Sequence, residues 1–323
     1  MNSLQIPEIL LNSGHKMPVI GLGSASSPPL PQEKLVPLLV DAIAAGYRHL
    51  DTAALYRTEE SVGGAVAESL LRGLVKSRDE IFITTKLQMT DAHRDRVLPA
   101  LRESLRKLGL DYVDLYLIHW PVSMKIDCSN NSTKIVNFEM KEIWEEMEKC
   151  CRMGLAKSIG VSNFSTTKLS ALLQIATIQP AVNQVEMNVG WQQQKMLEYC
   201  NEKGIHVSAY SPLGARGSSW GSNAVMENSI LDHVAGSMNK TIAQVNNVQV
   251  ALRWIYEQGA SMIVKSFNRE RMRENLQVFD WKVGDEYGEK IKEIPQNRVV
   301  KGEEFVGPDV EYKSVEELWD GEI

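Results

Sequence analysis

The sequence predicts an α/β protein, a (β/α)₈ TIM barrel preceded by a β-hairpin. Short apolar, β-branched segments alternate with amphipathic helical stretches, and eight strands are counted in this way. Strands that alternate with helices imply right-handed crossovers and a parallel sheet. The early G-x-G-x-x-G motif of the rival fold, an open doubly wound sheet, does not occur. No shift of composition marks a linker, so residues 1–323 are expected to form one domain.

The expected elements follow in order along the chain. A hairpin is expected over 6–20 with its turn at Asn12-Ser13-Gly14, and the first barrel strand is expected to end at Gly21. Further strands are expected at 47–51, 81–86, 113–118, 156–161, 181–186, 205–210 and 260–265. Helices are expected at 32–45, 59–75, 94–108, 139–153, 166–176, 193–203, 241–257 and 269–277. Long loops are expected at 121–138, 211–235 and 295–323, and these should choose the substrate.

Composition limits the function classes. The net charge of −6 and the pI of about 5.7 argue against nonspecific binding of nucleic acid. Four cysteines without a C-x-x-C spacing predict reduced thiols in a cytoplasmic protein (Cys128, Cys150, Cys151 and Cys200). Neither a signal peptide nor an apolar run of about 18 residues occurs, so no membrane partner is expected. Scattered histidines predict that no metal is bound.

Polar side chains stand where the predicted strands end. They are Asp51, Lys86, His119, Ser162, Asn163, Gln184, Tyr210, Ser211, Lys265 and Ser266. In a barrel the carboxyl ends of all strands meet at one face, which is where active sites form. These residues are therefore expected to converge on a single site.

The types of these residues indicate a reaction. A phenol has a pKa of about 10, and the ammonium of Lys86 should lower that of nearby Tyr56. Asp51 can neutralise the buried ammonium, and His119 can orient a carbonyl group. Such a set protonates a carbonyl oxygen while hydride reaches the carbon, which implies a nicotinamide cofactor. A carboxylate pair for glycoside hydrolysis, Asp51 with Glu186, would leave the lysine and the histidine without a role.

The stretch from Lys265 to Asn275 predicts the phosphate end of that cofactor. A strand end leads into a helix N-terminus with four basic residues, in an otherwise acidic protein. The alternative is an amphipathic helix with a solvated basic face. Gly21-Leu22-Gly23-Ser24 would allow a ligand to approach the backbone closely, although this signal is weak alone.

Several motifs together resemble the aldo-keto reductases over nearly the whole chain. They are Asp51-Thr-Ala-Ala-Leu-Tyr56, Ile83-Thr-Thr-Lys86, Leu115-Tyr-Leu-Ile-His119-Trp-Pro, Gly160-Val-Ser-Asn163-Phe, Gln184-Val-Glu and Val264-Lys-Ser-Phe-Asn. The resemblance implies a barrel that binds NADPH and reduces a ketone or aldehyde. Further segments are similar to the plant branch, which includes chalcone reductase-like, codeinone reductase-like and deoxymugineic acid synthase-like enzymes. A plant specialised metabolite is therefore the expected substrate, and a monomer the expected state.

The resemblance also implies residue roles. Tyr56 is the general acid, Lys86 and Asp51 tune its pKa, and His119 orients the carbonyl. By the same resemblance, the nicotinamide carboxamide is bound by Ser162, Asn163 and Gln184, and the nicotinamide ring stacks on Tyr210. The pyrophosphate is bordered by Ser211 and Leu213. The 2′-phosphate end is held by Lys265, Ser266, Asn268 and Arg271, and adenine lies near Glu274 and Asn275. Gly23, Ser24, Asp51 and Phe267 complete the cofactor set. The substrate set is Ala25, Tyr56, His119 and Trp120, with Trp191 and Trp220 either in the pocket or in packing.

Two alternatives and one departure accompany this hypothesis. A reductase of conjugated C=C bonds is disfavoured, since in the family that activity goes with Glu in place of the histidine. A non-catalytic NADPH-binding or sensing subunit would not need the intact set of Tyr56, Lys86, Asp51 and His119. The departure is the extra segment Asn246–Val250, which predicts either a helix about 7 Å longer at its start or a bulged loop.

Overall fold

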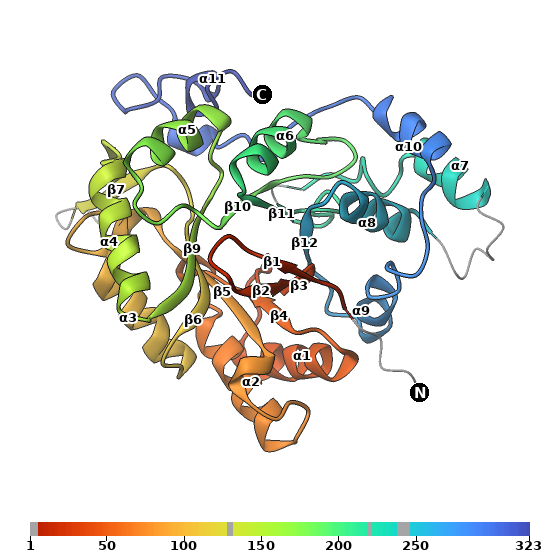
Figure 1. Cartoon of the computed structure of the whole chain (residues 1–323), viewed down its shortest axis with the longest axis horizontal. Coiled ribbons are helices and arrows are strands. Elements are labelled where there is room, and N and C mark those ends of the chain that lie inside the picture. The colour runs from red at the N-terminus through yellow and green to blue at the C-terminus, as the bar shows by residue number, and fades with distance from the viewer. Residues whose placement is uncertain (1–5, 128–131, 219–220, 238–245) are drawn as a thin grey trace.

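Eight parallel strands close into a barrel in sequential order (Figure 1). The computed structural model describes residues 6–127, 132–218, 221–237 and 246–323. The barrel strands are β3 (Ile20–Gly23), β4 (His49–Asp51), β5 (Phe82–Leu87), β6 (Val113–Ile118), β9 (Ala156–Ser162), β10 (Val182–Glu186), β11 (His206–Tyr210) and β12 (Ser261–Val264). Every residue of β5 and β6 is buried, because the barrel core covers one face and helices the other. The predicted fold is confirmed.

Helices surround the barrel on its outside (Figure 1). They are α1 (Gln32–Ala45), α2 (Glu59–Leu71), α3 (Val97–Leu108), α4 (Met140–Arg152), α5 (Thr166–Ile175), α6 (Gln194–Lys203), α8 (Asn247–Glu257) and α9 (Arg269–Asn275). In α3 the apolar residues at three- and four-residue spacing, Val97, Leu101, Leu105 and Leu108, are buried together with Ser104. The helix ends at Gly109, whose left-handed φ of 64° suits a glycine cap.

The N-terminal hairpin covers one end of the barrel. Strands β1 (Glu8–Leu10) and β2 (Lys16–Pro18) pair antiparallel around the predicted turn. Met17 is fully buried against residues of β5, β6 and β10, so the hairpin closes that end with apolar contacts. The first barrel strand runs on to Gly23 rather than ending at Gly21. A Cβ on Gly21 would lie 2.8 Å from the His49 ring, so this glycine permits packing inside the barrel rather than ligand approach.

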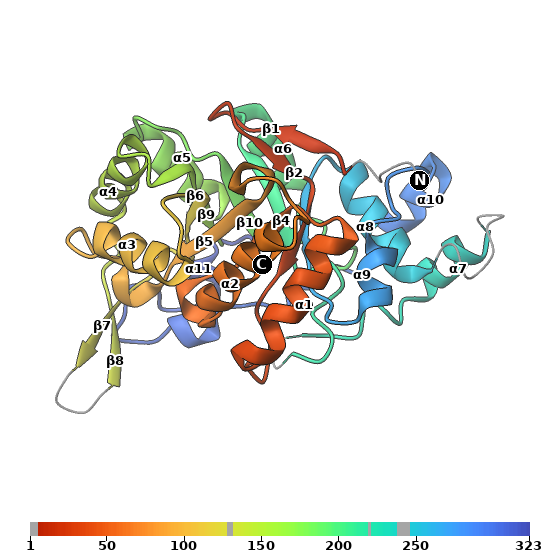
Figure 2. The same ribbon diagram turned by 90° about the horizontal axis from the view of Figure 1, so that it is seen from below.

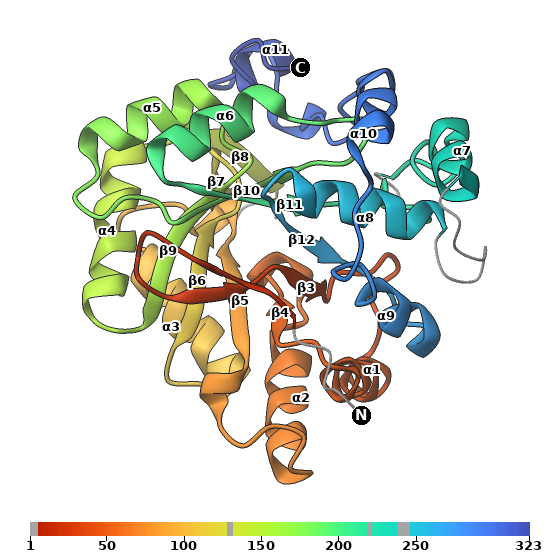
Figure 3. The ribbon, with the colours of Figure 1, turned by 45° about the vertical axis from the view of Figure 1, so that its right-hand side comes forward.

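The three predicted loops contain regular structure. Within 121–138, β7 (Ser123–Asp127) and β8 (Ser132–Val136) form a hairpin that projects from the body (Figure 2). Helix α7 (Ser229–Ser237) lies in the second loop, and α11 (Val315–Leu318) lies in the tail. An additional helix that the sequence does not predict, α10 (Asp285–Lys292), packs beside α7, which in turn packs against α8 (Figure 3). The prediction of unstructured loops is therefore wrong in these places. Of all described helices, none is long and apolar enough to cross a membrane.

The extra segment Asn246–Val250 forms the start of α8. Asn246 has extended backbone, its side chain accepts from the Gln249 N–H, and the Gln249 side chain accepts in return. This capping box stops the helix at Asn247, so a helix running through Asn246 is wrong, and residues 241–245 lie outside the described residues. Strand β12 keeps its parallel register with β3 and β11, as expected.

Candidate active site

A cavity of about 860 Å³ opens at the carboxyl ends of the barrel strands. Its lining from the predicted sets comprises Gly23, Ala25, Asp51, Tyr56, His119, Trp120, Ser162, Asn163, Gln184, Tyr210, Ser211, Leu213, Lys265, Ser266, Phe267, Asn268, Arg271, Glu274 and Asn275. The structure thus brings together residues from every part of the chain, as the convergence of strand ends requires.

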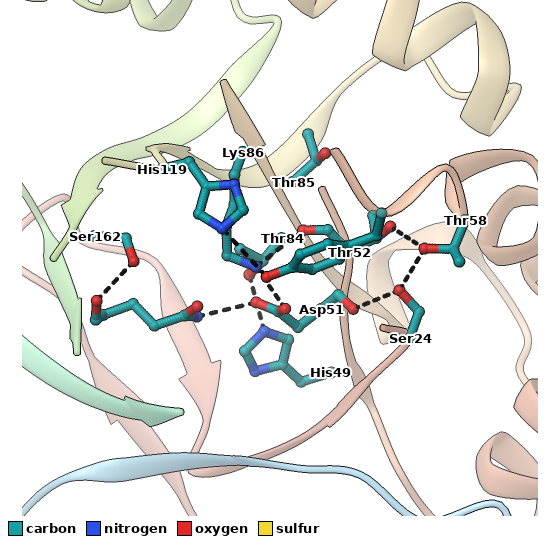
Figure 4. Close-up of polar contacts among 12 residues, drawn as sticks. Ser24, His49, Asp51, Thr52, Thr58, Thr84, Thr85, Lys86, His119 and Ser162 are labelled. Atoms are coloured by element: carbon teal, nitrogen blue, oxygen red, sulfur yellow. Dashed lines mark hydrogen bonds and ion pairs between the residues drawn. The ribbon is translucent and has the colours of Figure 1, made fainter. Parts of the chain in front are cut away.

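A buried ion pair lies at the floor of the site (Figure 4). The Lys86 Nζ donates to Asp51 Oδ1 at 2.6 Å and to the Thr52 carbonyl at 3.0 Å. The other carboxylate oxygen of Asp51 accepts from Gln184 Nε2 at 2.9 Å. Lys86 and Asp51 are almost fully buried, so each charge depends on these partners.

Tyr56 and His119 lie above this pair. Tyr56 ends the short 3₁₀ helix Ala54–Tyr56 that follows β4, and His119 follows β6. The phenol oxygen is 3.3 Å from His119 Nε2, and the two rings are nearly perpendicular. The Lys86 Nζ lies 4.9 Å from the centre of the Tyr56 ring. The predicted catalytic residues therefore form one contiguous group.

Burial and neighbouring charges together set the charge states of this group. Burial raises the pKa of the Tyr56 phenol, an effect that Lys86 opposes and Asp51 reinforces, so the predicted lowering is wrong in its net direction. Burial acts to lower the pKa of Lys86, but Asp51 and Tyr56 outweigh it, and the net shift is upward. Burial, with a smaller contribution from Lys86, lowers the pKa of His119 well below its ordinary value. At neutral pH the site therefore holds a protonated phenol, an ammonium and a neutral imidazole.

Polar groups beside His119 bond mainly to one another. Asn163 Nδ2 donates to the His119 carbonyl at 3.0 Å, and Asn163 Oδ1 accepts from the Tyr210 hydroxyl at 2.7 Å. Ser162 Oγ donates to the Gln184 carbonyl at 2.7 Å. Asn163 holds a left-handed φ of 63°, which asparagine tolerates better than most residues. This network fixes the backbone that carries His119.

The stretch from Lys265 to Asn275 forms the other end of the cavity. Asn268 caps α9, because its side chain accepts from the N–H groups of Glu270 and Arg271. Among described residues, no carboxylate forms an ion pair with Lys265, Arg271 or Arg216, all of which line the cavity. Three cations without an ion pair in one cavity make it suitable for phosphate groups.

Two predicted residues lie elsewhere than expected. The Ser24 side chain does not line the cavity; its hydroxyl donates to the Asp51 carbonyl at 3.0 Å and lies 2.7 Å from Thr58 Oγ1. Trp191 packs against the Arg298 guanidinium, 4.7 Å from its ring centre, and is not part of the cavity lining. Packing is therefore the correct reading of Trp191, and Trp220 lies outside the described residues.

Sequence reasoning missed several lining residues, most of which lie in loops or the tail. They are Leu55, Pro212, Ala215, Arg216, Ser218, Met226, Asn246, Val248, Ile263, Val300 and Glu304. Most follow no periodic pattern, so only their position after strand ends could have indicated them. Of the described residues, no group of three or more His, Cys, Asp or Glu could hold a metal ion.

Known proteins resemble this chain in sequence and structure. The model of the Aldo/keto reductase family matches residues 19–296. Rhazimal reductase 2 of Alstonia scholaris is 52% identical, with 99% of each chain covered. Deoxymugineic acid synthase 1-D of Triticum aestivum is 54% identical, with 95% of this chain and 97% of the relative covered. A solved aldo-keto reductase of Bombyx mori in complex with NADP has a TM-score of 0.83 and 37% identity, with 93% of this chain and 97% of that chain covered.

These matches extend over the barrel and the strand ends described above. The resemblance drawn from the motifs is confirmed, including the likeness to plant enzymes. The chain therefore belongs to the aldo/keto reductase family, and it is an oxidoreductase that acts on carbonyl groups.

Proposed function

We propose that residues 1–323 form one reductase domain that uses NADPH to convert a ketone or aldehyde of plant specialised metabolism into an alcohol. The observation that carries the proposal is the Tyr56 hydroxyl, which faces the cavity 3.3 Å from His119 with the Lys86–Asp51 pair beneath it. The plant relatives, a rhazimal reductase and a deoxymugineic acid synthase, support the class of substrate. A cytoplasmic location and a monomeric state stay predictions.

Tyr56 is the proposed general acid. Its phenol is protonated at neutral pH, and Tyr56 is one of the residues that line the cavity. As the proton moves to that oxygen, negative charge develops on the phenol, and the nearby Lys86 ammonium stabilises it. Asp51 keeps the ammonium charged in its buried position through the 2.6 Å contact.

His119 is proposed to orient the carbonyl group. A neutral imidazole can donate one N–H, and Nε2 is the ring nitrogen that faces the Tyr56 hydroxyl. A carbonyl oxygen placed between the two groups would accept from both. The Asn163 side chain holds the His119 backbone, which keeps the ring in place.

The residues present fit NADPH. When bound, the cofactor supplies the hydride that no side chain can donate. Lys265, Arg271 and Arg216 provide uncompensated positive charge for its phosphates. The side-chain amide of Gln184 donates to Asp51, so its side-chain carbonyl oxygen remains able to accept a hydrogen bond from the carboxamide of the cofactor. Ser162 and Asn163 already bond within the protein, so each would exchange a present bond for one to the cofactor.

The test follows NADPH oxidation with an aromatic aldehyde. Tyr56→Phe should lose roughly 10²- to 10⁴-fold in kcat, the usual contribution of a general acid, while NADPH binding persists. Tyr199→Phe is the matched control, because Tyr199 lies on α6 and is not part of the cavity lining. Equal and negligible turnover in the unmodified chain and in Tyr56→Phe would sink the proposal and favour a binding or sensing subunit.

A further inference from the structure

The segment from Val299 to Phe305 forms a fixed part of the cavity rim. The Glu186 carboxylate accepts from the N–H of Val299 at 3.1 Å and of Val300 at 2.8 Å. The Trp319 indole donates to the Lys301 carbonyl at 2.7 Å. Charge-assisted bonds to a buried carboxylate are strong, so the rim has a defined position relative to β10.

This rim lies on the substrate side of the cavity. The Phe305 ring packs on Trp120 with a centroid distance of 4.8 Å, and Trp120 directly follows His119. A Cβ on Gly302 would lie 3.2 Å from the Trp120 ring, at a left-handed φ of 75° that glycine allows. Val300 and Glu304 are the two residues of this segment that line the cavity.

Glu304 introduces a free negative charge into an apolar wall. Trp120 and Val300 pack in one apolar cluster with Phe305, and Ala25 and Leu55 are further apolar residues of the cavity lining. Glu304 is exposed, and among the described residues no Lys, Arg or His lies within ion-pair distance of its carboxylate. Of the other two carboxylates of the lining, Asp51 pairs with Lys86. Glu274 has no ion pair among the described residues either, but it lies on α9, at the end of the cavity that carries Lys265 and Arg271.

We propose that Glu304 selects carbonyl substrates that carry a cationic nitrogen at the end remote from the carbonyl group. The inference rests on the proposed function and specifies its substrate class. The carbonyl would meet Tyr56 and His119, an apolar body would lie along Trp120 and Val300, and the cation would meet the carboxylate at the rim. Because the carboxylate is exposed, solvent screens it, and the expected preference is about two- to fivefold in kcat/KM.

The experiment compares two aldehydes of matched shape, 4-(trimethylammonio)benzaldehyde and 4-tert-butylbenzaldehyde. The ratio of their kcat/KM values is measured for the unmodified chain, Glu304→Gln and Glu303→Gln. Because every protein is tested with the same two aldehydes, the difference in intrinsic reactivity between the aldehydes cancels when the ratios of the three proteins are compared. Glu303 is the control, because it is exposed and adjacent but does not line the cavity. NADPH binding is measured for all three proteins to show that the site is intact.

Glu304→Gln should lower the cationic-to-neutral ratio about two- to fivefold, Glu303→Gln should leave it unchanged, and added salt should shrink the difference. With 4-carboxybenzaldehyde, Glu304→Gln should instead raise kcat/KM. An unchanged ratio in Glu304→Gln, or an equal fall in Glu303→Gln, would overturn the inference and leave the proposed function standing. Failure of the unmodified chain to reduce any of these aldehydes would overturn the proposed function and this inference with it.

Discussion

A chain of buried hydroxyl groups holds the loop that carries Tyr56 (Figure 4). Ser24 donates its single proton to the Asp51 carbonyl, so Thr58 must donate to Ser24 Oγ at 2.7 Å. Thr52 must in turn donate to Thr58 Oγ1 at 2.9 Å. Because each hydroxyl has one proton, the direction of the whole chain is determined, and Thr58 is its centre.

Thr58→Val removes the central hydroxyl with almost no change of shape. Two hydrogen bonds are lost, and at about 1 kcal/mol each the free energy of unfolding should fall by about 2 kcal/mol. The helix α2 loses no cap, because the Thr58 side chain makes no capping bond. The Tyr56 hydroxyl should also become less well placed, so kcat should fall roughly tenfold. Denaturant unfolding midpoints and steady-state kinetics measure both effects.

A double-mutant cycle isolates the hydroxyl contact from other effects of the substitution. Ser24→Ala, Thr58→Val and the double variant should show a coupling energy of about 1 kcal/mol, as expected for one buried hydrogen bond. Thr58→Ser keeps the hydroxyl and should retain the activity. Additive effects of Ser24→Ala and Thr58→Val would refute the hydroxyl chain, as would full activity in Thr58→Val.

Two other predictions concern pH and the cofactor. Burial lowers the pKa of His49 to about 4 and that of His119 well below its ordinary value, so protons bind more readily to the unfolded chain. Stability should be complete above pH about 6.5 and fall toward pH 4, by at most about 1.4 kcal/mol per pH unit for each histidine. The free energy of unfolding, measured with denaturant at several pH values, should depend less steeply on pH in His49→Asn than in the unmodified chain, whereas substitution of exposed His15 should leave the pH dependence as it is. An unchanged pH dependence in His49→Asn would contradict this prediction. Arg271→Ala should weaken NADPH binding about tenfold and NADH binding little, whereas Arg273→Ala, on the same helix but outside the cavity, should change neither. Equal losses for both nucleotides, measured by fluorescence titration, would contradict a 2′-phosphate role.

Local patterns predicted the barrel well because strand and helix periodicities are local properties. Helix α1 occupies Gln32–Ala45 and β6 occupies Val113–Ile118, both as predicted. The missed hairpin β7–β8 had a local signal too, since Met124 and Ile126 alternate with polar residues. Helix α8 begins at Asn247, later than the apolar spacing predicts, because the cap at Asn246 starts the helix there.

The candidate site could be predicted only where strand ends fix its residues. Asp51, Lys86 and His119 stand at such ends, so the convergence of a barrel places them together. The direction of the pKa shift of Tyr56 could not be predicted, because it depends on how deeply the phenol is buried. The position of Ser24 after Gly23 gives no local sign that its hydroxyl donates to the Asp51 carbonyl and lies against Thr58 instead of lining the cavity.

The sequence by itself determined the barrel, the family and the group of polar strand ends, because each is encoded in neighbouring residues. Only the tertiary structure decided the substrate rim. Glu186 accepts from Val299 and Val300 across separations of 113 and 114 residues, and Tyr312 donates to the Pro121 carbonyl across 191. Contacts between segments so far apart leave no periodic trace in either segment. Their partners are chosen when the barrel closes and brings the tail over the ends of its strands.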